Sequence, residues 1–291
     1  MNHFKFSINL SRKTSSKTSL DLLAFLFLPL VLCPSLAGKN LKESPERAKE
    51  TIFQCIDAMG AEKYLAVKTE FVKGRDFFFK KNRRSGLIPF QSWTHYRDPV
   101  RHRHQTFKGK RQTLLIINLE LDKGWTQEGL YTIEEMPRDR LQRFKKNVKQ
   151  DLHYFLRNRL DEEGISFFYY DPTSISGSGK IEAVEIVDKT NNTLTIYFDI
   201  KTHLPVYTES VYTDKIGLRH KVRTEFFNWH EMGGVLTPLS FHYFEDGEKS
   251  QERFLESVIY NTKFSPDYFL EPRLSPKQAR KAKKRNINSN K

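Results

Sequence analysis

Cysteine is scarce in this chain, with two residues in 291, Cys33 and Cys55. If Cys33 leaves with an N-terminal leader, Cys55 stands alone and no intrachain disulfide can form. Cys55 falls on the apolar stripe of an expected helix, which is typical of a small buried hydrophobe rather than of a reactive nucleophile. We therefore expect stability to come from an apolar core.

Long apolar runs are also missing. After the N-terminus no apolar stretch approaches the ~20 residues of a membrane-spanning helix, and the mean hydropathy is -0.62. We therefore expect the mature protein to be soluble.

Motifs of catalysis are missing as well. The chain has no His-Glu-x-x-His, no Gly-x-Ser-x-Gly, no phosphate-binding loop and no Cys-x-x-Cys. We expect no enzyme and no cofactor. His102 and His104 share one face of an expected strand with His95 close by, which could indicate a metal. Because no acid or thiol stands at ligand spacing, surface or rim histidines are favoured over a metal site.

Acidic residues are absent from the C-terminus, and this explains most of the net charge of +14. Residues 273–291 carry eight Lys and Arg and no Asp or Glu, and residues 1–37 contribute three more net positive charges. Only +3 is left for the remainder. A nearly balanced domain argues against nucleic-acid binding, and we expect residues 273–291 to form a basic disordered tail.

The N-terminus resembles an export signal, which we assign to residues 1–37. Basic residues precede an apolar stretch at 22–32, and Ser35 and Ala37 are small residues at the −3 and −1 positions of a cleavage site. This predicts an exported, periplasmic protein that begins at Gly38. Two alternatives are a lipoprotein anchored through Cys33, although the residue before that cysteine is bulky, and an uncleaved anchor.

Two helices are expected. The first begins at Ser44-Pro45, an N-cap followed by proline at the first helical position, and ends at Gly60. The second runs from 137 to 160 with a long apolar stripe and a basic remainder. Such a helix could lie on an anionic membrane, but packing on a sheet is favoured.

The rest of the chain predicts antiparallel strands. A first block covers 64–80, 91–96, 101–107 and 113–119, with Gly74 as a bulge, and a meander resumes at 165 and extends to 264. In its clearest hairpin Asp199 closes the turn and Pro205 begins the returning strand. Two more hairpins turn at Gly233-Gly234 and Asp246-Gly247.

Several strands carry consecutive aromatic residues and lack the alternation of a sheet with one wet face. Examples are 77–79, 167–170 and 226–227, and Leu114–Ile117 is also apolar on both faces. Both faces therefore need cover. A curved sheet around the helices would leave an apolar groove suited to acyl chains, although composition alone favours a packed core without a cavity.

Short motifs, in chain order, carry a resemblance to a known family. They are Val72-Lys73-Gly74, Trp93 with Arg97-Asp98-Pro99, Asp122-Lys123-Gly124-Trp125, Asp199 with Thr202-His203-Leu204-Pro205, and Phe264-Ser265-Pro266. Together with the opening helix they resemble the periplasmic lipoprotein-carrier superfamily (LolA/LolB-like), and more closely its divergent branch of outer-membrane lipoprotein-sorting proteins. The resemblance implies an α+β, mainly antiparallel fold, an incomplete β-barrel wrapped around two or three helices. It places a lipid-binding domain at residues 38–272.

The resemblance also implies site residues. Carriers tether a helical lid with an arginine just before a proline; here Asp98 intervenes, so Arg97 inherits the role, with Arg101 and Arg103 as alternatives.

Four apolar side chains on the expected strands are candidates for lining the acyl cavity, although strand parity does not say which face is inside: Ile196, Phe198, Phe226 and Phe241.

Three functional hypotheses follow. The first is a monomeric, non-enzymatic periplasmic carrier that binds acyl chains of lipids or lipoproteins and touches envelope membranes, or a membrane-bound donor or acceptor, transiently. The second is an envelope interaction module that binds anionic lipid headgroups, lipopolysaccharide or cell-wall polymer. The third is a hydrolase with an unrecognised site.

The leader gives a first testable prediction. Because Ser35 and Ala37 fit the cleavage site, N-terminal sequencing of the protein from the envelope fraction should begin at Gly38. A diacylated Cys33 detected by mass spectrometry would contradict this and indicate a tethered protein.

Overall fold

The computed structural model describes residues 41–274 and 276, apart from positions 43, 81–82, 85, 110, 130–131, 176–178 and 215. The expected signal peptide, Cys33 and nearly all of the expected basic tail lie outside the described residues. Within the described range, no helix combines the length and apolarity needed to cross a membrane.

The strands of the described residues belong to one antiparallel sheet. In chain order they are β1 (Leu41–Lys42), β2 (Thr69–Lys80), β3 (Arg83–Arg84), β4 (Ile88–His95), β5 (Arg101–Lys108), β6 (Arg111–Asn118), β7 (Lys123–Glu128), β8 (Thr132–Glu135), β9 (Ser166–Ile175), β10 (Gly179–Val187), β11 (Thr193–Asp199), β12 (Pro205–Thr213), β13 (Arg219–Met232), β14 (Val235–Glu245) and β15 (Glu248–Tyr260).

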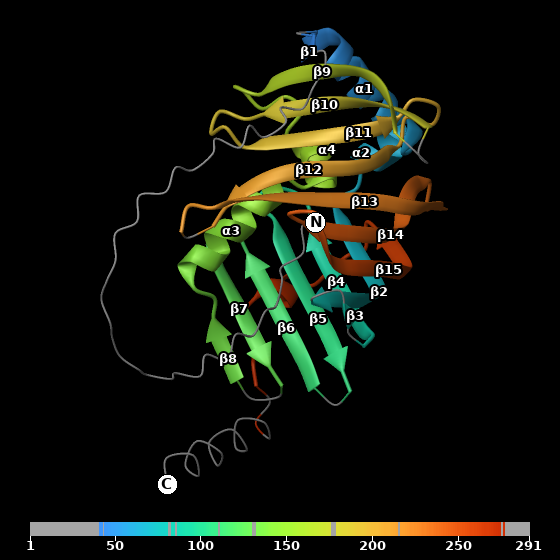
Figure 1. The fold of residues 1–291 in the computed structure, drawn as a ribbon. Coiled ribbons are helices and arrows are strands. Elements are labelled where there is room, and N and C mark those ends of the chain that lie inside the picture. The colour runs from blue at the N-terminus through green and yellow to red at the C-terminus, as the bar shows by residue number, and fades with distance from the viewer. Residues whose placement is uncertain are drawn as a thin grey trace, which may run out of the picture.

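The sheet consists of two meanders, the first of β2–β8 and the second of β9–β15. They are joined where β15 pairs with β2, which we call the seam. Its order is β1-β9-β10-β11-β12-β13-β14-β15-β2-β4-β5-β6-β7-β8, with β3 paired only to β2. Figure 1 shows β9–β13 running across the direction of β4–β8, so the sheet twists strongly between the two meanders. β1 and β8 end the order without pairing to each other. The expected fold, a mainly antiparallel half-open barrel with helices, is confirmed.

The first helix forms as its sequence predicts. Ser44 caps α1 (Pro45–Ala58) by accepting the Arg47 N–H at 3.3 Å, and Pro45 stands at the first turn. Cys55 is fully buried, and burial raises the pKa of its thiol, so it is the inert core residue that was expected. Gly60 follows at φ +119°, where a Cβ would lie 2.5 Å from the Gly234 carbonyl oxygen. Only glycine fits this contact between helix end and sheet.

The main core lies between three helices and β9–β14. Buried residues of α1, of α2 (Ala61–Leu65) and of α4 (Leu152–Asn158) form one apolar cluster with these strands. Helical members include Ile52, Tyr64, Phe155 and Leu156, and Met59 directly follows α1; all are under 2% exposed. This cluster fixes three of the four α-helices of the described residues on one face of the sheet.

The second expected helix is wrong in one respect, because the structure divides 137–160 into α3 (Arg138–Lys149) and α4. Asp151, at φ -73° and ψ 132°, is extended and caps α4 by accepting the Tyr154 N–H at 2.9 Å. Lys149 ends α3, and its carbonyl accepts from Arg159 Nη1 at 2.6 Å. Because both helices bury apolar side chains on the same face of the sheet, their apolar residues look like one continuous helical stripe in the sequence, and a single helix was expected.

The three expected hairpins are confirmed. Asp199 Oδ1 accepts the backbone N–H groups of Lys201 and Thr202 at 3.1 and 2.8 Å, and β12 begins at Pro205. The β14–β15 turn holds Asp246 and Gly247 at positive φ, the geometry of a two-residue hairpin. The β13–β14 turn lies at residues 233–234, as expected.

The expected bulge at Gly74 is instead on the partner strand, where the register of β15 shifts between Leu255 and Ser257. Gly74 is required by close packing. A Cβ there would lie 2.4 Å from the Phe254 carbonyl oxygen and 2.8 Å from the Phe90 ring. Sequence alone could not separate these two uses of a strand glycine.

A buried ion pair crosses the seam between the meanders. Arg253 on β15 donates from Nε and Nη2 to the two carboxylate oxygens of Asp76 on β2, both at 2.7 Å. The side chains are 5% and 1% exposed. Two parallel charge-assisted bonds fix the register of the seam.

This pair yields a stability prediction. Arg253→Met should lower the free energy of unfolding by about 3–5 kcal/mol, because it leaves the Asp76 carboxylate buried without its partner. Adding Asp76→Leu should recover most of the loss. The exposed pair Arg75–Glu256 joins the same strands, so Arg75→Met is a matched control expected to cost less than about 1 kcal/mol. Equal losses for both arginines in urea denaturation would contradict the prediction.

Candidate functional site

The candidate residues divide between the two faces of the sheet. Side chains of a strand alternate between the two faces of the sheet, and directly paired residues on neighbouring strands lie on the same face. The strand pairings therefore assign every strand residue to one of the two faces. We call the face that packs against the helices the inner face; it includes Val72 and its pair partner Ser92, and Ile196 and Ile117 in the clusters with the helices. The opposite side is the outer face.

α3 covers the inner face over β5 and β6. Its buried residues are Leu141 and Phe144, which pack with Leu115 and Ile117 of β6. Phe144 also stacks on His102 of β5, with ring centroids 6.0 Å apart. A helix of 12 residues thus rests on the sheet through a narrow apolar contact.

Both ends of α3 are held by hydrogen bonds to the sheet. Before its first turn, the Met136 N–H donates to the Gly124 carbonyl at 2.7 Å. After its last turn, buried Gln150 donates from Nε2 to the Thr193 carbonyl at 3.0 Å. The middle of the helix has the apolar contact and a half-exposed ion pair at its side, Lys145 Nζ to Asp122 Oδ1 at 2.6 Å. Helix α3 is therefore fixed to the sheet by hydrogen bonds at both ends and by a small apolar contact in its middle.

A small cavity of about 50 Å³ lies on the inner face, lined by residues of β2, β4, β14 and β15 and by His153 of α4. Val72, Phe90 and Phe241 form apolar parts of its wall, and Glu70 and Arg253 polar parts. Small-molecule sites usually measure about 300–1,000 Å³. This cavity therefore cannot hold an acyl chain unless its walls move.

A partly buried arginine, Arg157, contacts Tyr96, which lines this cavity. Arg157 of α4 donates from Nε to the Tyr64 carbonyl at 3.1 Å, and its guanidinium lies 4.3 Å from the Tyr64 ring centroid and 5.1 Å from that of Tyr96. Tyr96 in turn donates to Glu70 at 2.8 Å. Burial raises the pKa of Glu70, partly offset by Arg157. This network joins α4 to β2 and has the character of a structural support.

The histidines take different places from those expected. His102 and His104 do share a face, with rings stacked 6.1 Å apart, but His102 is buried beneath α3 rather than at the surface or rim. Burial lowers the pKa of both, that of His104 to about 3 with Arg253 contributing. His95 pairs with Arg101 and faces the outer side. Among the described residues, no group of three metal-binding side chains forms a metal site.

The four cavity candidates all lie on the inner face. Ile196, Phe198 and Phe226 belong to the main core, at 0%, 0% and 7% exposure, and pack with α1, α2 and α4. Phe241 is half-buried and lies on the wall of the small cavity. Their binding of lipid stays a prediction.

Two of the three arginine candidates lie on the outer face and the third lies in an exposed loop. Arg97 is exposed in the loop between β4 and β5. Arg103 donates to the Tyr268 carbonyl at 3.3 Å and lies against the rings of Trp93 and Tyr268. Arg101 lies 5.9 Å from the Phe269 ring centroid. Two of them therefore hold the C-terminal segment on the outer face, and the tethering of a lid stays a prediction.

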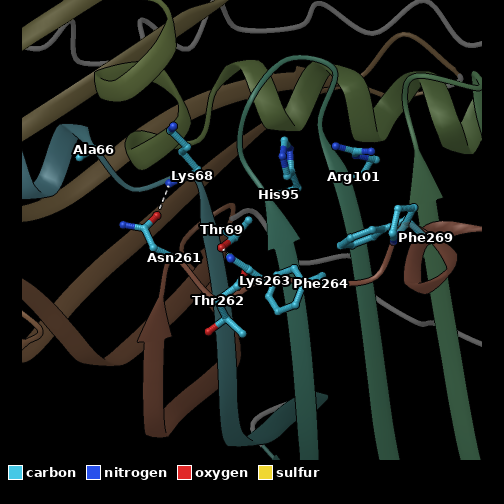
Figure 2. A pocket seen from close by; sticks show the side chains of 11 residues that line it. Ala66, Lys68, Thr69, His95, Arg101, Asn261, Thr262, Lys263, Phe264 and Phe269 are labelled. Carbon is cyan, nitrogen blue, oxygen red and sulfur yellow. Dashed lines mark hydrogen bonds between the residues drawn. The ribbon is translucent and has the colours of Figure 1, made fainter.

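A larger opening lies on the outer face where β2, β4 and β5 meet the C-terminal segment. This strand-end cleft measures about 670 Å³. Ala66, Phe264, Pro266 and Phe269 form its apolar lining. Figure 2 shows Phe264 and Phe269 below a row of three polar side chains.

That row consists of Lys68, His95 and Arg101, and Lys263 adds a further cation to the lining (Figure 2). His95 Nδ1 is buried and has no hydrogen-bond partner among the described residues. Burial, followed by the charge of Arg101, lowers the pKa of this imidazole. The cleft can therefore offer positive charge and a neutral imidazole to a ligand.

The strand-end cleft was not predicted from the sequence. Lys68 and Lys263 stand 195 positions apart and meet only because β15 pairs with β2. The sole local signal is the Phe264-Ser265-Pro266 motif, which the resemblance treated as a mark of family rather than as part of a site.

No family model and no curated protein sequence matches the chain. Among solved structures it is similar to a DUF1329 family protein from Desulfovibrio piger, with 12% identity, a TM-score of 0.52, and coverage of 78% of this chain and 99% of that one. This likeness establishes a shared fold.

Two other solved structures are similar at lower scores. One is a putative outer membrane lipoprotein-sorting protein domain from Vibrio parahaemolyticus, with 11% identity, a TM-score of 0.49, and 77% and 97% coverage. The other is a LolA superfamily protein from Nitrosomonas europaea, with 8% identity, a TM-score of 0.42, and 77% and 97% coverage. The fold that the sequence resemblance implied, a mainly antiparallel incomplete barrel with helices, is the fold observed.

The partly buried imidazole of His104 predicts a dependence of stability on pH. Its pKa is lower in the folded protein, so only the unfolded chain binds the proton between about pH 6.5 and pH 3, and folding loses stability as pH falls through that window. His104→Phe should remove this loss. The stability of the variant relative to wild type should rise by up to about 1.4 kcal/mol per pH unit below 6.5.

Denaturation in urea at pH 8 and pH 5 measures this difference. His220 supplies a control of opposite sign, because the carboxylates of Asp246 and Asp214 raise the pKa of its exposed imidazole. His220→Gln should therefore cost more stability at pH 5 than at pH 8. A His104→Phe variant that keeps the wild-type pH dependence would contradict the assignment.

Proposed function

We propose that this protein is a non-enzymatic carrier that binds the acyl chain of a lipid or lipoprotein between α3 and the inner face of the sheet. The observation that carries the proposal is the narrow contact of α3, which buries Leu141 and Phe144 on an apolar strip of β6. Displacing the middle of this helix would expose that strip, while the hydrogen bonds at both ends of the helix are kept.

The energies of opening and binding are comparable. Burying two large apolar side chains contributes about 1.5–3 kcal/mol each, so α3 is held by roughly 3–6 kcal/mol. An acyl chain of about twelve carbons gains roughly 0.8 kcal/mol per methylene when it is fully buried, or about 9 kcal/mol. A bound chain can therefore offset the cost of moving α3, and no catalytic group is needed.

The fold and the sequence support a place in the cell envelope. The predicted leader favours export to the periplasm, and the half-open barrel agrees with the fold expected of the lipoprotein-carrier superfamily. In this proposal the protein is a monomer that receives its cargo from a membrane or a membrane-bound donor and delivers it to an acceptor. Lipoprotein sorting and lipid transfer both fit.

The proposal predicts how α3 and β6 control uptake of a neutral fluorescent acyl amide. Phe144→Ala should raise the apparent affinity at least about tenfold, because the binding-competent open state becomes more populated. Leu115→Trp should fill the strip and abolish uptake. Leu114→Trp changes the neighbouring buried residue of β6, which faces the outer side, and is the matched control.

Circular dichroism and thermal melts establish that each variant folds. Equal uptake by the Leu115→Trp and Leu114→Trp variants would contradict binding under α3. No uptake by folded wild-type protein across several chain lengths would leave the envelope interaction module as the better hypothesis.

A further inference from the structure

The strand-end cleft is independent of the proposed acyl site. Thr69, His95 and Arg101 line it and pair with one another across β2, β4 and β5, on the face opposite to α3. Its volume of about 670 Å³ lies in the middle of the range for small-molecule sites, without any movement of the chain.

The charge of the cleft has one sign. Lys68, Arg101 and Lys263 all line it, and none of its lining residues in the described part of the chain is Asp or Glu. Among the described residues, Arg101 has one ion-pair contact, to the half-exposed Glu120 at 3.4 Å. Neither lysine has an ion-pair partner in that part of the chain. Three cations around one opening favour an anionic group.

Hydrogen bonds fix the backbone next to Lys68 and Lys263, the two lysines of the cleft. The Lys68 N–H donates to Asn261 Oδ1 at 2.8 Å, the Asn261 N–H donates to the Thr69 carbonyl at 2.8 Å, and Thr69 Oγ1 donates to the Thr262 carbonyl at 2.7 Å. These three bonds join the beginning of β2 to the segment that follows β15. Such a frame needs little ordering when a ligand binds.

The opposite wall is apolar and equally fixed. Phe264 and Phe269 meet edge to face, with centroids 6.0 Å apart. Asn118 of β6 donates from Nδ2 to the Phe269 carbonyl at 3.2 Å, which holds this segment on the sheet. An apolar wall beside a cationic rim fits a molecule with an anionic head and an apolar body.

We infer that the strand-end cleft binds an anionic amphiphile. Lys68, Arg101 and Lys263 contact its phosphate or other anionic head, and Phe264 and Phe269 contact its apolar part. The buried His95 Nδ1 supplies one further polar contact to the head. A phospholipid and a free anion share this head chemistry, and the apolar wall selects the amphiphile.

Isothermal titration calorimetry with three probes tests this inference. The probes are dodecyl phosphate below its critical micelle concentration, dodecyl maltoside with the same chain and a neutral head, and inorganic phosphate. Dodecyl phosphate should bind at least about tenfold more tightly than either of the others. The titrations use wild-type protein and the Leu115→Trp variant, in which the proposed acyl site is filled.

Charge-matched variants locate the binding. Lys68→Gln with Lys263→Gln should weaken dodecyl phosphate at least about tenfold, because two charge-assisted contacts are lost. The control is Lys189→Gln with Lys201→Gln, which removes two exposed lysines from turns of the other meander and should leave the affinity unchanged. Phe264→Ser should weaken dodecyl phosphate without changing the affinity for inorganic phosphate.

Several results would overturn the inference. They are equal binding of dodecyl maltoside, binding of inorganic phosphate as tight as that of dodecyl phosphate, and full retention of affinity in the cleft double variant. Failure here is distinguishable from failure of the carrier proposal. The cleft variants should keep uptake of the neutral acyl amide, and the Leu115→Trp variant should keep binding of dodecyl phosphate.

Discussion

The pairing of β15 with β2 is the interaction on which the rest of the structure depends. It joins two meanders that would otherwise be separate sheets, and the buried Arg253–Asp76 pair fixes its register. A buried ion pair is costly when it is broken, so this register admits few alternatives. Because the register sets which side chains face inward, one interaction aligns the inner face of both meanders.

The open order of the sheet then explains how its two faces differ. Helices gather on the inner face, where α1, α2 and α4 make a dense core and α3 makes a narrow contact. The outer face of the first meander is covered by the C-terminal segment, which Arg103 and Asn118 hold in place. The two proposed sites therefore lie on opposite faces of the same strands, one closed and apolar, the other open and cationic.

Much of the fold could be predicted because its signals are local. The Ser44 cap, the Asp199 and Asp246 turns and the strand runs each act within a few residues. The break at Gln150–Asp151 could not be predicted, since it depends on a bond from Gln150 to β11. For the same reason the burial of His102 and the assembly of the strand-end cleft were missed, because the first depends on α3 packing over β5 and the second on the pairing of β15 with β2.

The pairing of β15 with β2 also determines when the sheet can finish folding during synthesis. Asp76 and Arg253 are 177 positions apart, so β2 keeps an unpaired edge until β15 has also left the ribosome. A 12-residue strand with an open edge is a template for pairing with other chains, and contacts this distant form slowly. An incomplete chain should therefore depend on chaperones to keep that edge from aggregating, and truncation before β15 should be more harmful than loss of an equal length from the N-terminus.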